Sequence, residues 1–252
     1  MSGSYPNFSF YYDNQDRSDV IICFSGKKVY AHKLILAGAS EFFHIAFKSN
    51  FPVHRSRPHA FKHRTDKAHQ IASQAEVEIE DFPPEVVYAM IRHIYGYPFN
   101  QAFMASRPNL SQLPDFWVAV LLIANEYRVQ SLTAAATDTI LTFLGKNICP
   151  TTELFQNFPQ DYKDNFARTV YKVSDLYHNN KLADNSCLDG MIWILCQHGV
   201  WIYEEHMNIG KALEGLEPVC ARVLHLMNEQ RKFLKCCCNR LITDEPHQHT
   251  VG

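Results

Sequence analysis

The stretch from Asp19 to Phe51 constrains the fold more than any other part of this chain of 252 residues. Apolar residues alternate with smaller or polar ones over Val20–Phe24, which is typical of a strand that buries one face. Turn-forming residues follow at Ser25–Lys28, and Val29–Ala31 resumes the extended pattern. The sequence therefore predicts a two-stranded β-hairpin here.

The hydrophobic period becomes helical directly after this hairpin. The next residues with helical spacing are Leu34, Ile35, Ala37 and Gly38. Ser40 then offers a hydroxyl cap, and Glu41 lies in the first turn of a second amphipathic segment. That segment carries Phe43, Ile45, Ala46 and Phe47. Two short helices are therefore predicted after the two strands.

Residues in this order resemble the start of a BTB (POZ) domain. That family opens its first strand with aspartate and valine, continues with an Ala-His-Lys/Arg step and an aliphatic run, and places a serine before a phenylalanine-rich helix. The matching residues here are Asp19, Val20, His32, Lys33, Leu34, Leu36, Ala37, Ser40, Phe42 and Phe43.

A second block of the resemblance begins at Glu76. Apolar and acidic residues alternate over Glu76–Glu80, which predicts a half-buried strand. Pro83 and Pro84 then open a helix, because proline is tolerated in the first turn. The inward stripe of this helix is Val86, Val87, Met90, Ile91, Ile94 and Tyr95. BTB domains carry a similar strand and a helix that ends in tyrosine, with a glycine such as Gly96 close by.

The third block is a predicted helical hairpin from Phe116 to Leu144, with a break near Arg128–Gln130. The segment before it, from Asn100 to Pro114, is expected to be a loop, with Asp115 as the helix cap. In BTB domains an aliphatic run leads to alanine, then tyrosine, then leucine. The corresponding residues here are Ala124, Tyr127 and Leu132.

Three blocks in the family's order imply an α+β BTB/POZ fold, a small sheet covered by helices, over residues 18–145. Residues 1–17 are expected to be a tail, or a strand that crosses to a partner through Tyr5–Tyr12. Within the domain, 52–75 is predicted to be an enlarged basic and histidine-rich loop. Residues 146–238 resemble the helical region after the BTB domain of many fungal proteins, and 239–252 are predicted to be a disordered tail.

Composition and charge limit the classes of partner. The formal net charge of −2 argues against nucleic acid or an anionic membrane as a chain-wide electrostatic partner. No run approaches the ~18 to 20 apolar residues of a membrane span. The first residues also lack the basic and apolar regions of a secretory signal. We expect a protein of the cytoplasm or nucleus, with mostly reduced cysteines.

The resemblance implies a protein-interaction module that forms a homodimer. In dimeric BTB domains an acid and a base form a charged pocket at the base of the interface, and Asp19 and Lys33 match these two positions. Opposite charges near a symmetric apolar interface can satisfy each other while they specify register. The alternative is that Asp19 only caps a strand and that Lys33 is solvated.

The resemblance also implies a role as substrate adaptor of a cullin-RING ubiquitin ligase. Such adaptors present an apolar residue, any residue and then glutamate after the third helix, but Gly96–Asp115 contains no glutamate. The alternative is a transcriptional or chromatin scaffold that acts through protein contacts. Without a zinc-finger array or helix-turn-helix pattern, any contact with DNA would be indirect.

Two further clusters have alternative interpretations. The loop histidines His54, His59, His63 and His69 suit nucleic acid, phosphopeptide, pH response or metal, whereas the plain interpretation is a solvated insertion. The run Cys236, Cys237, Cys238 has basic neighbours that suit reversible acylation, or zinc binding with His247 and His249, whereas the plain interpretation is an exposed helix end.

Sequence motifs of enzymes are absent from the chain. We find no phosphate-binding glycine motif, no GxSxG, no HExxH and no motif of paired catalytic carboxylates at helical spacing. We therefore expect no catalytic residue, no cofactor and no resident metal. An enzyme whose catalytic residues come from distant parts of the sequence is the second alternative, and it would need a pocket that holds titratable groups with shifted pKa values.

Overall fold

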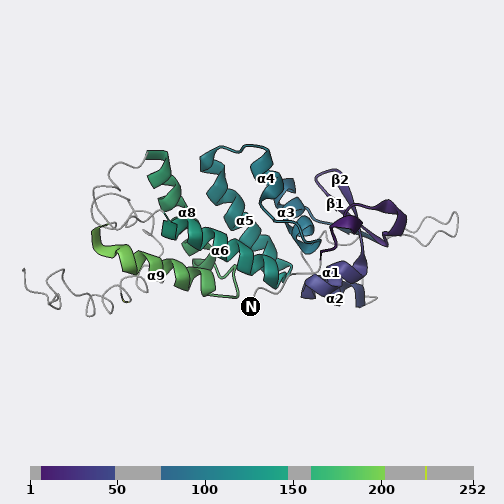
Figure 1. Cartoon of the computed structure of the whole chain (residues 1–252). Coiled ribbons are helices and arrows are strands. Elements are labelled where there is room, and N and C mark those ends of the chain that lie inside the picture. Colours follow the sequence, from purple (N-terminus) through teal and green to yellow (C-terminus); the bar gives the residue numbers. More distant parts are fainter. Residues whose placement is uncertain (1–6, 49–74, 147–159, 202–224, 226–252) are drawn as a thin grey trace, which may run out of the picture. The chain divides into compact units, whose positions relative to one another are not determined.

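The computed structural model describes residues 7–48, 75–146, 160–201 and 225 (Figure 1). The chain divides into two compact units, Met1–Ile140 and Leu141–Gly252. Among the described residues, the first unit contains the sheet and most of the helices, and the second contains two long helices. Each unit is described by itself below.

A three-stranded sheet forms one layer of the first unit. Its strands are β1 (Val20–Phe24), β2 (Lys27–Ala31) and β3 (Ala75–Glu78), in the order β2-β1-β3. β1 pairs with β2 antiparallel and with β3 parallel. The predicted hairpin is confirmed, and β2 begins two residues earlier than expected because Ser25 and Gly26 alone form the turn, with φ of 48° and 73°.

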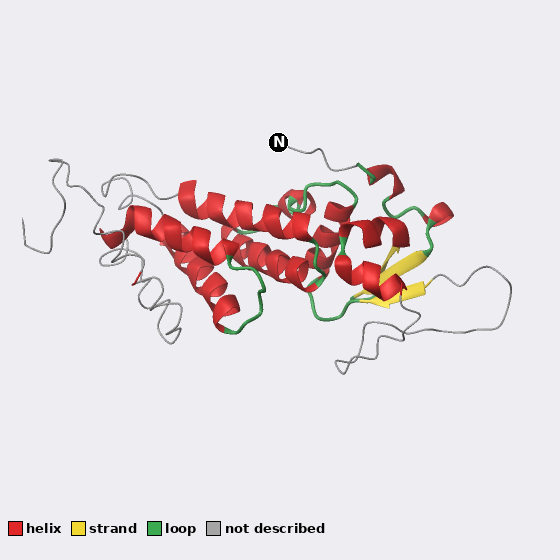
Figure 2. Ribbon diagram, turned by 90° about the horizontal axis from the view of Figure 1, so that it is seen from below, coloured by secondary structure: helices red, strands yellow, loops and turns green. Residues whose placement is uncertain are grey.

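The two faces of this sheet differ as the alternation of the sequence predicts. Val20, Ile22 and Phe24 of β1 are buried, whereas the intervening residues are half-buried. Val77 is also buried on β3, and the ladder continues past the strand, since the Ile79 amide donates to the Cys23 carbonyl at 2.8 Å. Figure 2 shows helices packed next to the strands, and these helices cover the buried face of the sheet.

Six of the described helices belong wholly or mainly to the first unit. They are α1 (Lys33–Ala39), α2 (Glu41–Lys48), α3 (Pro84–Ile94), α4 (Gln101–Ala105), α5 (Leu113–Glu126) and α6 (Gln130–Lys146). All residues of the predicted inward stripe of the third helix are buried. The predicted helical hairpin is α5 and α6. The boundary between the units falls within α6.

The segment before this hairpin is not the loop that the sequence suggested. It contains α4 and a 3-10 turn, Leu110–Gln112. The apolar contact of α4 is made by Phe103, whose ring stacks on Phe116 with 3.9 Å between centroids, and the Gln101 side-chain oxygen accepts a hydrogen bond from Arg92 at 3.3 Å. A helix with a single half-buried apolar residue has no hydrophobic period to detect. α5 also begins two residues before Asp115, which lies in its first turn and is not its cap.

The N-terminal segment packs against the first unit. Ser9–Tyr11 and Gln15–Arg17 are 3-10 turns, and no strand forms between residues 7 and 17 of this single chain. The Tyr12 ring meets the Tyr95 and Tyr97 rings edge-on, at 5.7 Å in each case. A strand exchanged between two copies stays a prediction.

The second unit contains α8 (Gln160–His178) and α9 (Ser186–Trp201), which lie within the helical region expected over 146–238. Its core includes Phe166, Val170, Val173, Met191 and Ile192. The predicted loop at 52–75, apart from Ala75 in β3, and the predicted tail at 239–252 lie outside the described residues. No helix within the described ranges is long and apolar enough to cross a membrane.

Candidate protein-interaction site

Asp19 directly precedes β1 and lies near the start of α1. Its carboxylate Oδ1 accepts a hydrogen bond from the Lys33 backbone amide at 2.7 Å. Its own amide donates to the Ala31 carbonyl at 3.2 Å. The structure thus brings the two predicted residues together through the backbone of Lys33. A carboxylate at this end of a helix is stabilised by the free amides there. The charged pocket between two copies stays a prediction.

His32 is positioned by the hydroxyl of Tyr95. The His32 amide donates to Tyr95 Oη at 2.9 Å, and the ring Nδ1 lies 3.0 Å from the same oxygen. The hydroxyl proton can therefore go to Nδ1, which leaves the proton of the neutral ring on Nε2. Nε2 is buried and has no partner among the described residues. Burial lowers the pKa of His32, and the Asp19 carboxylate opposes that shift.

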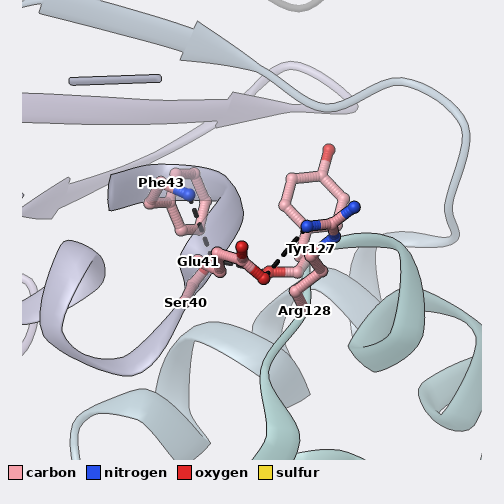
Figure 3. Close-up of polar contacts among 5 residues, drawn as sticks. All are labelled: Ser40, Glu41, Phe43, Tyr127 and Arg128. Carbon is pink, nitrogen blue, oxygen red and sulfur yellow. Dashed lines mark hydrogen bonds and ion pairs between the residues drawn. The ribbon is translucent and has the colours of Figure 1, made fainter. Parts of the chain in front are cut away.

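Ser40 joins two parts of the domain that are far apart in sequence (Figure 3). It is buried, and its Oγ accepts from the Phe43 amide at 3.1 Å, so it caps α2 as the sequence predicts. The same hydroxyl donates to the Tyr127 carbonyl at 2.6 Å, at the turn between α5 and α6. Next to it, Glu41 and Arg128 form an exposed ion pair of 3.0 Å.

The family-motif aromatic residues gather around the same turn. The Tyr127 ring lies 4.8 Å from the Phe42 ring and 5.5 Å from the Phe43 ring, between centroids. Tyr127 is buried, and burial raises the pKa of its hydroxyl. Ala124 and Leu132, on the helices that flank the turn, are also buried. These contacts hold α2 against the α5–α6 turn.

A groove of about 920 Å³ opens beside this junction, between α1, the end of α3 and the start of α6. Its lining includes Leu34, Ile35 and Ile94. On one side, His93 Nε2 lies 3.1 Å from Ser131 Oγ, and burial lowers the pKa of His93. We refer to this hollow below as the α1 groove.

Four large apolar side chains in the described part of the first unit are exposed: Met104 of α4, at 48%, and three at the N-terminal end of the unit. Phe10 exposes 83% of its surface, Leu34 84% and Ile45 53%. Leu34 is the only one of these three that the family pattern singled out in the sequence. Phe10 lies within Tyr5–Tyr12, the stretch that the sequence analysis offers as a strand crossing to a partner. Ile45 was missed as an interface candidate, because an amphipathic pattern shows which face is apolar and does not show which apolar residues stay exposed.

The domain combines a small sheet, a helical hairpin that is hydrogen-bonded to a buried serine, and exposed apolar side chains. These features are typical of an interaction domain. The BTB/POZ domain family model matches residues 10–144, which is more than half of the chain. The chain therefore belongs to the BTB/POZ family, whose domain is a protein–protein interaction module. No curated protein matches the chain.

Several predicted site residues lie outside the described part of the chain. They are His54, His59, His63, His69 and Cys236–Cys238. The described ranges hold no group of three or more histidine, cysteine or acidic side chains arranged to bind a metal ion.

Proposed function

We propose that this BTB/POZ protein forms a homodimer through the exposed surface of its N-terminal segment, α1 and α2, and recruits protein partners in that form. The observation that supports the proposal most directly is the exposure of Phe10, Leu34 and Ile45. Monomeric proteins seldom leave contiguous apolar surface uncovered. All three residues come from elements at the N-terminal end of the domain.

The energetic gain from covering these side chains is substantial. Full burial of a leucine, isoleucine or phenylalanine is worth about 1.5–3 kcal/mol each. A two-fold interface gains each contribution twice, since both copies present the same surface. Asp19 and Lys33, at the start of β1 and of α1, are close enough to this surface to set its register through their charges.

The absolute mass of the protein in solution tests this proposal. We expect a dimer at tens of micromolar by light scattering on a size-exclusion column, for the full chain. Leu34→Asp should convert it to monomer. Met104→Asp is the matched control, because Met104 is an apolar helical residue that is 48% exposed on α4. A monomeric wild-type chain would refute the proposal.

The adaptor role in a cullin-RING ligase is a second candidate, and Met104 is the observation that favours it. Adaptors of the family present an apolar residue two positions before a glutamate after the third helix, and here Met104 is exposed with Ser106 two positions later. A pull-down with a cullin N-terminal domain tests it. We expect Met104→Asp to abolish capture and Ser106→Glu to strengthen it, whereas no capture of any cullin would exclude the role.

A further inference from the structure

Phe10 meets the Tyr11 ring edge-on, at 5.8 Å between centroids, and the described residues leave most of its own ring exposed. The next residue, Tyr11, places its ring 5.7 Å from that of His32, and Tyr12 packs edge-on against Tyr95. Both tyrosines are half-buried, whereas Phe10 exposes 83% of its surface. The turn Ser9–Tyr11 therefore presents a phenyl ring to solvent while its two successors anchor the backbone.

Hydrogen bonds and a cation–π contact fix the same turn. The Ser9 amide donates to Asn7 Oδ1 at 2.9 Å, and Tyr97 Oη donates to the Ser9 carbonyl at 3.2 Å. The Arg92 guanidinium lies 4.2 Å from the centre of the Tyr97 ring and 5.5 Å from that of Tyr12. A side chain on such a fixed turn loses little further freedom when it binds.

The α1 groove is a hollow of suitable chemistry for such a ring. Its apolar lining comes from Phe8, Ile35, Ile94 and Ala134, and Gly38 leaves open space, since a Cβ there would meet no atom within 4 Å. At about 920 Å³, it is near the upper end of the ~300–1,000 Å³ range of ligand pockets. It has room for a phenyl ring together with part of the turn that carries it.

Several of the polar groups that line the groove are paired within the chain. His93 Nε2 contacts Ser131 Oγ at 3.1 Å, and Arg128 pairs with Glu41 at 3.0 Å. An occupant therefore has no strong charge to neutralise, and a hydrophobic side chain fits better than an acidic or basic one. This favours a neutral aromatic residue over a highly charged peptide.

A two-fold interface requires that the projecting group and its recess, here the Phe10 ring and the α1 groove, lie on the same surface of each copy. Leu34 lines the groove and also belongs to the exposed surface assigned above to the dimer, so the groove is continuous with that surface. Phe8 also lines the groove and is two residues from Phe10. We propose that in the homodimer Phe10 of each protomer occupies the α1 groove of the other. This inference rests on the proposed dimer.

The exposed area agrees with this assignment. An aromatic side chain buries about 150–250 Å². Phe10, Leu34 and Ile45, at their exposed fractions of 83%, 84% and 53%, would supply roughly half of the ~800 Å² that each partner of a standard interface contributes. Two reciprocal insertions close the assembly at two copies, whereas a ring and a hollow on opposite sides would build a fibre.

Three variants of the full chain test the contact by sedimentation. Phe10→Ala removes one ring from each protomer and should raise the dimer Kd by about two to four orders of magnitude, because the two-fold contact is lost twice. Gly38→Leu fills the groove, and it should do the same while it leaves α1 intact because the space there is open. Gly38→Ala is the matched control and should change the Kd less than about threefold. A Gly38→Leu dimer of wild-type Kd would overturn the inference.

Photocross-linking identifies the residues that Phe10 touches. Benzoylphenylalanine replaces Phe10 in a mixture of ¹⁴N- and ¹⁵N-labelled chains, and mass spectrometry locates the products. We expect mixed-isotope products at residues of α1 and α6 that line the groove. A dimer whose cross-links lie elsewhere, or within one chain, overturns the inference and leaves the proposed dimer standing. A chain that is monomeric before irradiation overturns both.

Discussion

Replacing Ser40 by alanine should cost this domain more stability than any ordinary loss of a serine hydroxyl. The hydroxyl accepts from the Phe43 amide at 3.1 Å and donates to the Tyr127 carbonyl at 2.6 Å, and the residue is 1% exposed. Loss of the helix cap costs about 1 kcal/mol. A buried carbonyl left without its donor costs about 1–3 kcal/mol more. The sum is roughly 2–4 kcal/mol, a large part of the 5–15 kcal/mol that holds a typical domain folded.

Thermal unfolding and hydrogen exchange measure this effect. For a chain of this length we expect Tm to fall by roughly 5–15 °C. Peptides that cover α2 and the α5–α6 turn should both exchange faster, because the one hydroxyl serves both. Ser106→Ala is the matched control, since its Oγ donates to the Phe103 carbonyl at 2.6 Å on an exposed surface. It should change stability by no more than about 0.5 kcal/mol.

The prediction for Ser40 fails under two observations. One is a loss below about 1 kcal/mol, close to that of the Ser106 control, which would mean that water or a shifted backbone replaces both hydrogen bonds. The other is faster exchange at α2 alone, which would mean that the Tyr127 carbonyl does not depend on the serine.

Two further predictions concern a helix contact and pH. Gly190→Ala should destabilise the chain by about 1 kcal/mol, because its Cβ would lie 2.5 Å from Leu141 Cδ1. Gly145→Ala, whose Cβ would have its nearest atom at 3.7 Å, should stabilise α6 by up to about 1 kcal/mol. Urea denaturation measures both changes in the free energy of unfolding, and changes of the same sign would contradict the contact. Burial lowers the pKa of His93 and of His32, so the unfolded chain binds more protons below the ordinary histidine pKa of about 6.5. Stability should therefore fall as pH falls from 7 to 5.5, and less steeply in His93→Asn; a steeper fall in that variant would refute the assignment.

The sequence predicts the secondary structure of the first unit well because its periods are unambiguous. Glu76–Glu80, which includes most of β3, alternates strictly between acidic and apolar residues, and α3 carries an apolar stripe that is buried throughout. α4 was missed because Phe103 is its one half-buried anchor against Phe116, and a single apolar residue has no period. The match to the family supplied the rest of the order.

The candidate site was harder to predict for a different reason. Ser40 was identified as a cap, but its second partner, Tyr127, is 87 residues away and no local pattern connects them. Asp19 and Lys33 were paired by family resemblance, and the contact that joins them uses the backbone amide of Lys33. Side chains that meet only in three dimensions, and those that stay exposed such as Ile45, leave no trace in a linear pattern.

The parallel pairing of β1 with β3 has a consequence for how this domain tolerates change. Parallel strands cannot be joined by a tight turn, so the chain between them must make a long return in any case. Of that return, residues 49–74 lie between α2 and β3. The entropy of closing a loop grows only with the logarithm of its length, so each doubling costs about 0.6 kcal/mol. Additional residues in the return from β1 to β3 should therefore alter the folding free energy little, and the sheet can keep its pairing while the length of that return changes.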